Sequence, residues 1–270
     1  MHTLQHRPRK RFSQNFLVDR HTIGRIVDAV NPQRGERIVE IGPGRGALTR
    51  PLLERVDRLT VIEIDRDLAG ALRSEHSPER LTVVVADALT VELSSLGSGL
   101  RIVGNLPYHI SLPLLFHCAK QIEHLTDLHF MLQAEVVDRM AASPGTPEYG
   151  RLSVTLQSVF IVEKLFRVPA AAFLPVPAVE SAVARLIPLA DMRPAIRDRR
   201  IFETVVAAGF GQRRKTLRNA LQKHISAEAL EDLGVDPGVR AETLPVAVFI
   251  AIANAVALAQ APSLNSSVHS

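Results

Sequence analysis

The sequence predicts an α/β fold, with an open sheet flanked by helices and a small helical domain at the C-terminal end. Three observations predict it. Short apolar runs of strand length alternate with stretches of helical spacing over residues 22–189. A glycine, a carboxylate or an amide follows each of the first four runs, as at the ligand-binding edge of open α/β sheets. Beyond residue 194, the apolar residues keep helical spacing alone.

Length and composition fit a globular protein. The chain has 270 residues, 46% hydrophobic and 22% charged, which allows one large domain with or without a small companion. A single cysteine, Cys118, cannot form a disulfide within the chain, and this fits a cytoplasmic protein. The ten histidines lack metal-ligand spacing, so we expect no metal. We also expect no signal peptide and no membrane span, because the longest apolar run, residues 246–261, is interrupted by polar residues and is shorter than the ~20 residues a span needs.

Positive charge is concentrated in two separate parts of the chain. Residues 1–30 contain six Lys and Arg against two acidic residues, and residues 193–223 contain nine against two. A run of charge is usually only a solvated face. Two separate basic patches indicate instead a polyanion that lies across the surface.

The chain begins with an N-terminal arm that mixes cations, amides and aromatic residues without periodicity, up to residue 17. Cations beside stacking side chains are typical of proteins that bind single-stranded nucleic acid, and Arg9, Lys10 and Arg11 are the predicted contacts. The aromatic residues of the arm would equally pin it to the core. Residues 22–30 then show the spacing of an amphipathic helix.

A glycine-rich loop, Gly-Pro-Gly-Arg-Gly from Gly42, follows the first predicted strand. Glycines allow a sharp turn and the close approach of a ligand to the backbone. Glu63, 21 residues after Gly42, stands at the end of the second strand, where a carboxylate accepts hydrogen bonds from ribose hydroxyls. Asp87 follows the third strand. A nicotinamide-dinucleotide enzyme shares the first two features, but its loop has the spacing G-x-G-x-x-G and this one has G-x-G-x-G.

The fourth predicted strand ends in the turn Asn105-Leu106-Pro107-Tyr108. Proline has no N–H and ends the strand. The Asn105 oxygen can accept hydrogen bonds from an exocyclic amine, and the Tyr108 ring can stack on a flat heterocycle. The turn therefore predicts chemistry on the amino group of a base, although an isolated motif of this kind also fits an ordinary strand-ending turn.

The remaining elements complete the sheet and add the helical domain. Besides the strand that ends at Asn105, the predicted strands are residues 37–41, 59–64, 81–85, 125–132, 161–168 and 182–189, and helices are predicted at residues 47–55 and 133–140. We predict a catalytic domain with its arm over residues 1–190, a helical RNA-binding domain over residues 191–261, and a disordered tail over residues 262–270.

The helical domain carries a basic run that includes Arg213, Arg214, Lys215 and Arg218. Arg214 and Arg218 are four residues apart, so we expect them on one helical face with Lys215 beside them. Such a face suits the phosphates of an RNA backbone.

Together these motifs resemble those of class I (Rossmann-like) S-adenosylmethionine methyltransferases. With Gln-Asn-Phe-Leu at residues 14–17, they resemble the ribosomal RNA adenine N6,N6-dimethyltransferase family. The resemblance continues through Tyr-Gly-Arg-Leu-Ser-Val from residue 149, Phe-Leu-Pro-Val-Pro-Ala-Val-Glu-Ser-Ala-Val from residue 173, and Gln-Arg-Arg-Lys-Thr-Leu-Arg-Asn from residue 212. It spans residues 8–258, nearly the whole chain.

The resemblance implies methyl transfer from S-adenosylmethionine to N6 of adenine in ribosomal RNA. It implies that the Asn105 side-chain oxygen and the Leu106 carbonyl accept the N6 hydrogens, which localises the nitrogen lone pair toward the methyl group. Tyr108 would stack on one face of the flipped adenine. Phe173 is a candidate for the other face, or else a core residue.

The cofactor would be held along the strand ends. The resemblance implies that Glu63 binds the ribose hydroxyls, Asp87 binds the adenine amino group, and the Gly42 backbone admits the methionine end. Asn15 and Leu17 would close over the cofactor from the arm, and Asn105 would border it. Glu40, before the loop, is expected to orient the loop rather than to touch the cofactor.

Two branches of the family compete. One dimethylates two adjacent adenines in the 3′-terminal hairpin of small-subunit ribosomal RNA during ribosome assembly. The other dimethylates one adenine of large-subunit RNA and confers resistance to macrolide-type antibiotics. Leu106 and the basic run resemble the first branch, so we expect action on a 30S assembly intermediate. We also expect the chain to act as a monomer. Ser13, Val176 and Glu180 depart from the usual Gly, Pro and Asp.

Two other classes are compatible with parts of the sequence. A non-catalytic assembly factor could keep the fold, but the intact Glu63, Asp87 and Asn105 argue against it. A DNA adenine methyltransferase uses a similar turn, usually Asp/Asn-Pro-Pro-Tyr, yet no segment here is suited to reading duplex DNA.

Overall fold

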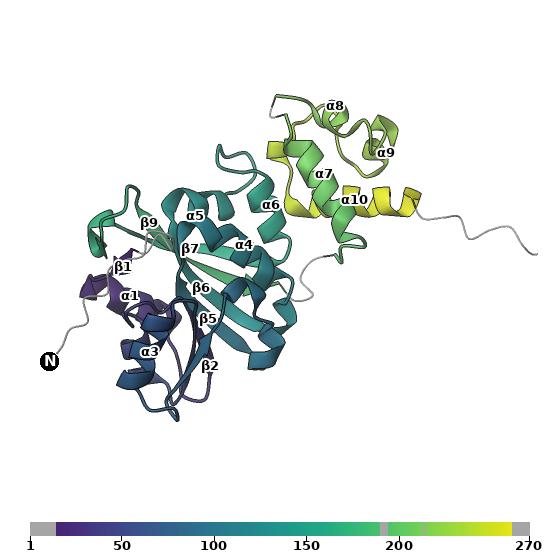
Figure 1. Ribbon diagram of the computed structural model, residues 1–270. Coiled ribbons are helices and arrows are strands. Elements are labelled where there is room, and N and C mark those ends of the chain that lie inside the picture. Colours follow the sequence, from purple (N-terminus) through teal and green to yellow (C-terminus); the bar gives the residue numbers. More distant parts are fainter. Residues whose placement is uncertain (1–14, 190–193, 213, 261–270) are drawn as a thin grey trace, which may run out of the picture. The chain divides into compact units, whose positions relative to one another are not determined.

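The computed structural model describes residues 15–189, 194–212 and 214–260, which form two compact units (Figure 1). The first unit holds the described residues up to Ala141 together with Phe160–Pro188. The second holds Ala142–Val159 and the described residues from Leu189 onward. The predicted contacts Arg9, Lys10, Arg11 and Arg213 and the predicted tail, residues 262–270, lie outside the described residues.

A seven-stranded sheet in the order β4-β3-β2-β5-β6-β9-β7 forms the centre of the first unit. The first five strands in this order run parallel, whereas β9 pairs antiparallel with both β6 and β7. The strands are β2 (Arg37–Ile41), β3 (Leu59–Glu63), β4 (Leu81–Val85), β5 (Leu100–Asn105), β6 (Leu125–Gln133), β7 (Phe160–Val168) and β9 (Ser181–Pro188). The predicted strands are thus confirmed, with ends that differ by one residue at most.

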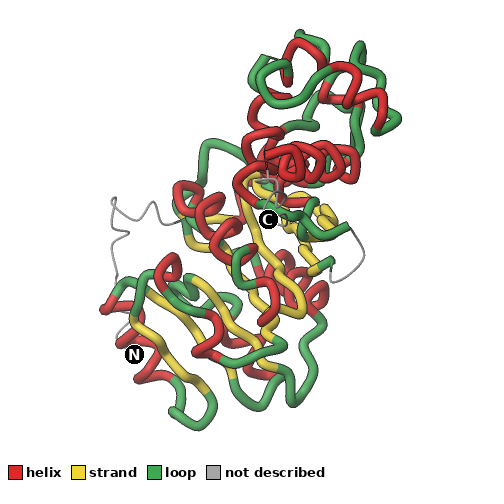
Figure 2. Tube along the Cα trace, turned by 90° about the vertical axis from the view of Figure 1, so that its right-hand side faces the viewer, coloured by secondary structure: helices red, strands yellow, loops and turns green. Residues whose placement is uncertain are grey.

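Helices connect and flank these strands (Figure 2). They are α1 (Arg20–Val30), α2 (Thr49–Arg55), α3 (Arg66–Glu75), α4 (Tyr108–Ala119) and α5 (Ala134–Met140), with short 3₁₀ helices η2 (Ala88–Thr90), η3 (Leu93–Leu96), η4 (Ile122–His124) and η5 (Ala170–Ala172). Helix α1 begins two residues before the predicted start because Asp19 caps it, its Oδ2 accepting a hydrogen bond of 2.8 Å from the Thr22 N–H. The central strands are apolar runs buried between helices, as parallel strands require.

A second, two-stranded sheet joins the N-terminal arm to a distant loop. β1 (Phe16–Leu17) pairs antiparallel with β8 (Phe173–Leu174), so Leu17 lies opposite Phe173. The Val18 N–H also donates to the Ala172 carbonyl at 2.9 Å. Periodicity did not predict this pair, because two-residue strands are too short to show alternation.

The second unit is helical and has a core of its own. It contains α6 (Arg151–Gln157), α7 (Arg199–Phe210), α8 (Leu217–Leu221), α9 (Ala227–Asp232), η6 (Ala241–Thr243) and α10 (Val246–Gln260). Phe202, Phe249 and Leu217 lie fully buried at its centre. The helical spacing predicted from residue 194 onward is confirmed by α7, α8 and α10.

The division of the chain differs from the predicted one at residues 142–159. We expected this segment in the first domain, but it packs with the C-terminal helices. The Tyr149 and Phe210 rings pack edge to face, with 6.1 Å between their centroids. The Tyr149 hydroxyl donates to the Leu244 carbonyl at 2.8 Å. Burial of Tyr149 and Val154 in the helical core explains the placement, since neither side chain can be buried without partners from that core.

The prediction that Arg214 and Arg218 share a helical face is wrong. Helix α8 begins at Leu217, after its N-cap Thr216, so Arg214 and Lys215 lie in the turn that precedes the helix. The Leu217 N–H instead donates to the Val239 carbonyl at 2.7 Å, which fixes the turn. Arg214, Lys215 and Arg218 are all exposed.

Within the described ranges, no helix combines the length and the apolar character that crossing a membrane would require. In the same ranges, no three His, Cys, Asp or Glu side chains gather as a metal site would need.

Candidate active site

A cavity of about 890 Å³ opens at the carboxyl ends of the parallel strands. Its wall includes residues from the ends of four strands, namely Gly42, Glu63, Asp87 and Asn105. The other predicted site residues of the first unit that line it are Asn15, Leu17, Leu106, Tyr108 and Phe173. The structure therefore brings together every predicted catalytic and cofactor-binding residue, drawn from six separate parts of the chain.

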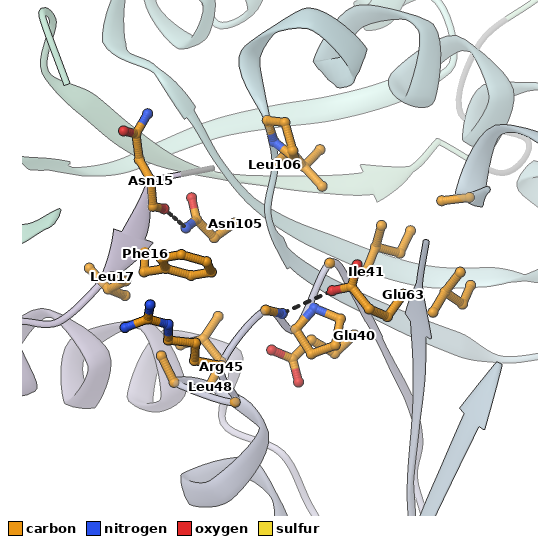
Figure 3. A pocket seen from close by; sticks show the side chains of 18 of the residues that line it. Asn15, Phe16, Leu17, Glu40, Ile41, Arg45, Leu48, Glu63, Asn105 and Leu106 are labelled. Carbon is orange, nitrogen blue, oxygen red and sulfur yellow. Dashed lines mark hydrogen bonds between the residues drawn. The ribbon is translucent and has the colours of Figure 1, made fainter. Parts of the chain in front are cut away.

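The glycine-rich loop turns beneath the cavity. Gly42, Gly44 and Gly46 have φ angles of 66°, 56° and 77°, in the left-handed region that side chains with a Cβ rarely adopt. Their freedom lets the loop leave β2 and bring the Gly44 N–H to Glu63, whose Oε2 accepts from it at 3.1 Å (Figure 3). The loop and the tip of β3 thus form one wall.

Glu63 is fixed at that wall by backbone donors. Its Oε1 accepts from the Asp65 N–H at 2.9 Å, and its side chain is largely buried. Burial raises the pKa of Glu63, and the hydrogen bonds from Asp65 and Gly44 oppose this shift. Each carboxylate oxygen keeps a second lone pair, so the group can still accept hydrogen bonds from a ligand.

Asp87 lies beyond the end of β4 and caps η2. Its Oδ1 accepts from the Leu89 N–H at 2.9 Å, which holds the half-buried carboxylate at the cavity wall. Carboxylates held in this way accept hydrogen bonds from amino or hydroxyl groups.

Glu40 lies behind the loop and is fully enclosed. The Thr49 hydroxyl at the start of α2 donates to its Oε2 at 2.6 Å. Burial, followed by the nearby charge of Glu63, raises the pKa of Glu40 to about 8, although the Thr49 hydrogen bond lowers it. This contact joins β2 to α2 on either side of the loop. Glu40 also lines the cavity, so its role in orienting the loop stays a prediction.

We predict that Glu40 makes the stability of the chain depend on pH. Between the usual carboxyl pKa and about 8, the folded chain keeps a proton on Glu40 that the unfolded chain has released. Raising the pH through this window should therefore lower the free energy of unfolding, by about 1 kcal/mol per pH unit. The Glu40→Gln side chain is neutral at every pH, so this variant should lack that pH-dependent contribution to the free energy of unfolding. Urea unfolding of both proteins at pH 6, 7 and 8 gives the free energy of unfolding at each pH. The same dependence of this free energy on pH in both proteins would contradict the prediction.

The backbone just before the turn that follows β5 has no room for a side chain at position 104. Gly104 lies opposite Ile41 in the parallel pair of β5 with β2. A Cβ on Gly104 would come within 2.8 Å of the Ile41 carbonyl oxygen and 2.9 Å of Leu106 Cδ2, closer than real contacts allow. The Leu106 N–H donates to the Met131 carbonyl at 3.2 Å, which fixes the turn to β6. Pro107 then begins α4 as its N-cap.

The arm orients the Asn105 amide. Asn105 Nδ2 donates to the Asn15 backbone carbonyl at 3.2 Å (Figure 3). Because this contact engages the amide nitrogen, the side-chain oxygen is the atom left to accept hydrogen bonds from a substrate. The arm therefore helps to arrange the predicted acceptor.

Tyr108 is positioned through its hydroxyl, which lies 3.2 Å from Ser181 Oγ at the start of β9. Ser181 is buried, whereas Tyr108 is half-buried at the cavity wall. Sequence reasoning used the Tyr108 ring alone and missed Ser181. Ser181 stands within the segment 173–183 that carries the family resemblance, but no local pattern connects it to Tyr108.

We predict that Tyr108→Phe keeps the stacking ring but loses several-fold in single-turnover rate. The substitution leaves the buried Ser181 hydroxyl without this partner, and such a loss costs about 1–3 kcal/mol in the protein. The double variant Tyr108→Phe with Ser181→Ala should recover part of the rate, and Tyr108→Ala should be much the slowest. Equal rates for Tyr108→Phe and Tyr108→Ala would show that the ring is not what matters.

The sequence analysis did not predict a contact between Arg45 and Phe16, two further residues that line the cavity. The Arg45 guanidinium lies over the Phe16 ring, 4.5 Å from its centre, so the arm contacts the glycine loop (Figure 3). A Cβ on Gly44 would lie 3.2 Å from the same ring. Phe173, only 3% exposed, lines the cavity and also packs with Leu17 in the core, so its stacking role stays a prediction.

Comparison with known proteins identifies relatives over nearly the whole chain. A family model described as ribosomal RNA adenine dimethylase matches residues 5–258. The chain is 53% identical over 253 residues to a protein of Aromatoleum aromaticum, covering 94% of this chain and 96% of that protein. It is 56% identical over 247 residues to one of Thiobacillus denitrificans, covering 92% and 97%. Both are named ribosomal RNA small subunit methyltransferase A.

Solved structures share the fold. The 23S rRNA methyltransferase ErmE superposes with a TM-score of 0.71 at 28% identity, covering 90% of this chain and all of that one. A dimethyladenosine transferase from Plasmodium falciparum gives 0.73 at 22% identity, covering 88% and 95%, a likeness of fold. The match of the family model over almost the whole length, together with relatives more than half identical, shows that this chain belongs to the ribosomal RNA adenine dimethylase family.

Proposed function

We propose that this chain transfers methyl groups from S-adenosylmethionine to N6 of two adjacent adenines in the 3′-terminal hairpin of small-subunit ribosomal RNA, giving N6,N6-dimethyladenosine. The single observation that carries the proposal is the Asn105 turn, whose oriented amide lines the same cavity as Glu63 and Asp87. Relatives named for the small subunit, more than half identical to this chain, support the choice of substrate.

S-adenosylmethionine fits the residues of this cavity. A volume of about 890 Å³ is within the range of small-molecule sites, about 300–1,000 Å³. Glu63 offers carboxylate lone pairs for the ribose hydroxyls, and Asp87 offers them for the adenine amino group. Gly42, without a side chain, leaves room for the methionine end, and Asn15, Leu17 and Asn105 border the same space.

When bound, S-adenosylmethionine supplies an electrophilic methyl group for in-line attack by N6. The protein aligns the two reactants and prepares the nucleophile. The Asn105 oxygen and the Leu106 carbonyl accept the two N6 hydrogens, which weakens delocalisation of the nitrogen lone pair into the ring. The Tyr108 ring, held through Ser181, stacks on the flipped adenine, and such stacking contributes about 1–3 kcal/mol per base. Loss of the N6 proton completes each transfer, and a second transfer gives the dimethylated base.

Exposed cations of the helical unit would bind the RNA backbone. Arg214, Lys215 and Arg218 are exposed and can each approach a phosphate. We infer further that the chain works in the cytoplasm as a monomer on a 30S assembly intermediate.

Transfer of tritium from labelled S-adenosylmethionine tests the function. Under-methylated small subunits, large subunits and DNA are incubated in parallel with the chain. We expect label in small-subunit RNA alone, at a plateau of four methyl groups per subunit, since two adenines each receive two. Label in large subunits would favour the activity named for ErmE, and label in none would overturn the proposal.

A further inference from the structure

A polar cluster ties the segment that follows β4 to the far end of α4. His117 Nε2 lies 2.8 Å from the Val91 carbonyl oxygen, and Gln121 Oε1 accepts a hydrogen bond of 2.6 Å from the Leu93 N–H. The Gln121 amide nitrogen lies 2.9 Å from His117 Nε2, so the two side chains are in contact. Gln121 is buried and His117 is half-buried. We call this pair of side chains the His117–Gln121 clamp.

Both elements that the clamp joins reach the cavity at the strand ends. The segment after β4 contains Asp87 and Ala88, and α4 begins with Tyr108, and all three residues line that cavity. Neither His117 nor Gln121 is among the described residues of the lining. An effect of the clamp on a bound ligand must therefore pass through the residues that it holds in place.

Helix α4 is the fixed side of this contact. Its Leu114, Leu115 and Cys118 side chains are fully buried, so packing along the helix sets its position. The segment after β4 is instead built from the short 3₁₀ helices η2 and η3, and Thr90 and Glu92 within it are exposed. This segment depends less on packing than α4 does, so the hydrogen bonds of the clamp contribute more to its placement.

The chemistry of the two backbone partners defines the role of each atom in the clamp. The Leu93 N–H can only donate, so Gln121 turns its side-chain oxygen toward it. The Val91 carbonyl can only accept, so His117 carries a proton on Nε2. The Gln121 amide nitrogen then faces the His117 Nε2–H, and both of these groups are donors. The clamp therefore lacks one acceptor, which a carboxylate at position 121 would supply.

We propose that the His117–Gln121 clamp positions Asp87 against the adenine end of S-adenosylmethionine. The inference rests on the proposed function, because the adenine contact of Asp87 is taken from there. Asp87 lies four residues before Val91, and its carboxylate caps η2, so a shift of this short segment would move the carboxylate. His117 and Gln121 are thus positioning residues, which act through Asp87 and touch neither reactant.

Cofactor affinities in a double-variant cycle test the inference. Titration calorimetry with S-adenosylmethionine is performed on the unmodified chain, Gln121→Leu, Asp87→Ala and the double variant. We expect each single substitution to weaken binding about tenfold, since each deprives the cofactor of one well-placed hydrogen bond. The double variant should bind no more weakly than Asp87→Ala, because the clamp acts through that carboxylate. Independent effects would multiply to about 100-fold, and this result would overturn the inference.

Two further variants separate positioning from a general loss of stability. Gln157→Leu removes a comparable hydrogen bond, to the Ala142 carbonyl at 2.8 Å in the helical unit, and should leave cofactor affinity unchanged. Gln121→Glu offers an acceptor oxygen to Leu93 and another to His117, so its affinity should stay within about twofold of that of the unmodified chain. A loss with Gln157→Leu, or with Gln121→Glu, as large as that with Gln121→Leu would overturn the inference.

Transfer rates distinguish a misplaced cofactor from a damaged catalytic turn. At saturating S-adenosylmethionine, Gln121→Leu should reach the single-turnover rate of the unmodified chain, because the clamp bears on cofactor binding and not on the target adenine. A lower rate at saturation would overturn the inference. Unchanged affinity in Asp87→Ala would overturn the role of Asp87 and the inference with it. Failure of the unmodified chain to bind S-adenosylmethionine or to methylate small subunits would instead overturn the proposed function, so the failures are distinguishable.

Discussion

Replacing Asn105 with Ala is expected to lower the single-turnover rate of methyl transfer by about 100- to 1,000-fold, the range seen when one oriented hydrogen-bonding group is removed from a transition state. The acceptor is needed chiefly when N6 rehybridises, so the loss should fall on the rate and much less on RNA affinity. Rates at saturating RNA, together with RNA affinities measured separately, give the two quantities. A normal rate would contradict the proposed role of Asn105.

Asn105 also holds the arm, so a control must separate the two roles. Asn105→Ala loses both the acceptor and the hydrogen bond to the Asn15 carbonyl. Asn105→Asp keeps an acceptor oxygen but cannot donate to that carbonyl when ionised. If the main role of Asn105 is to accept the N6 hydrogens, Asn105→Asp should have a higher single-turnover rate than Asn105→Ala. If the arm contact dominates, both variants should be equally slow and should bind cofactor equally poorly.

Replacing Glu63 with Ala is expected to weaken S-adenosylmethionine binding by about 10- to 100-fold, since lost hydrogen bonds to a charged group contribute about 1.5–3 kcal/mol. The ribose would lose its acceptors, and the Gly44 and Asp65 N–H groups would lose theirs. RNA affinity should stay nearly the same, because the helical unit and its cations are untouched. Titration calorimetry measures the affinity for S-adenosylmethionine, and an RNA-binding assay on the same protein measures the affinity for RNA.

Glu63→Gln provides the graded control. Its amide keeps one oxygen acceptor but turns an N–H toward either Gly44 or Asp65, both of which are donors. We expect an intermediate affinity for the cofactor, between the unmodified chain and Glu63→Ala. Unchanged affinity in both variants would mean that Glu63 only supports the glycine loop.

The sequence alone determined the sheet and the residues at its ligand-binding edge. Apolar runs of strand length predicted β2 to β7 and β9 because burial between helices leaves an unbroken local pattern. Gly42, Glu63, Asp87 and Asn105 lie at or just beyond the carboxyl end of a strand, and parallel strands end at one edge, so their meeting in one cavity follows from chain order. Family resemblance then gave these positions their chemical roles.

Only the tertiary structure showed which groups hold the side chains of Asn105 and Tyr108 in place. The Asn15 carbonyl meets the Asn105 amide across 90 positions of the chain, and Ser181 meets Tyr108 across 73. It also placed residues 142–159 in the helical unit and put Arg214 before α8 instead of on it. Periodicity records only which face of a local segment is buried. Pairs of side chains far apart in the chain are chosen by packing of whole elements, and no local pattern contains that information.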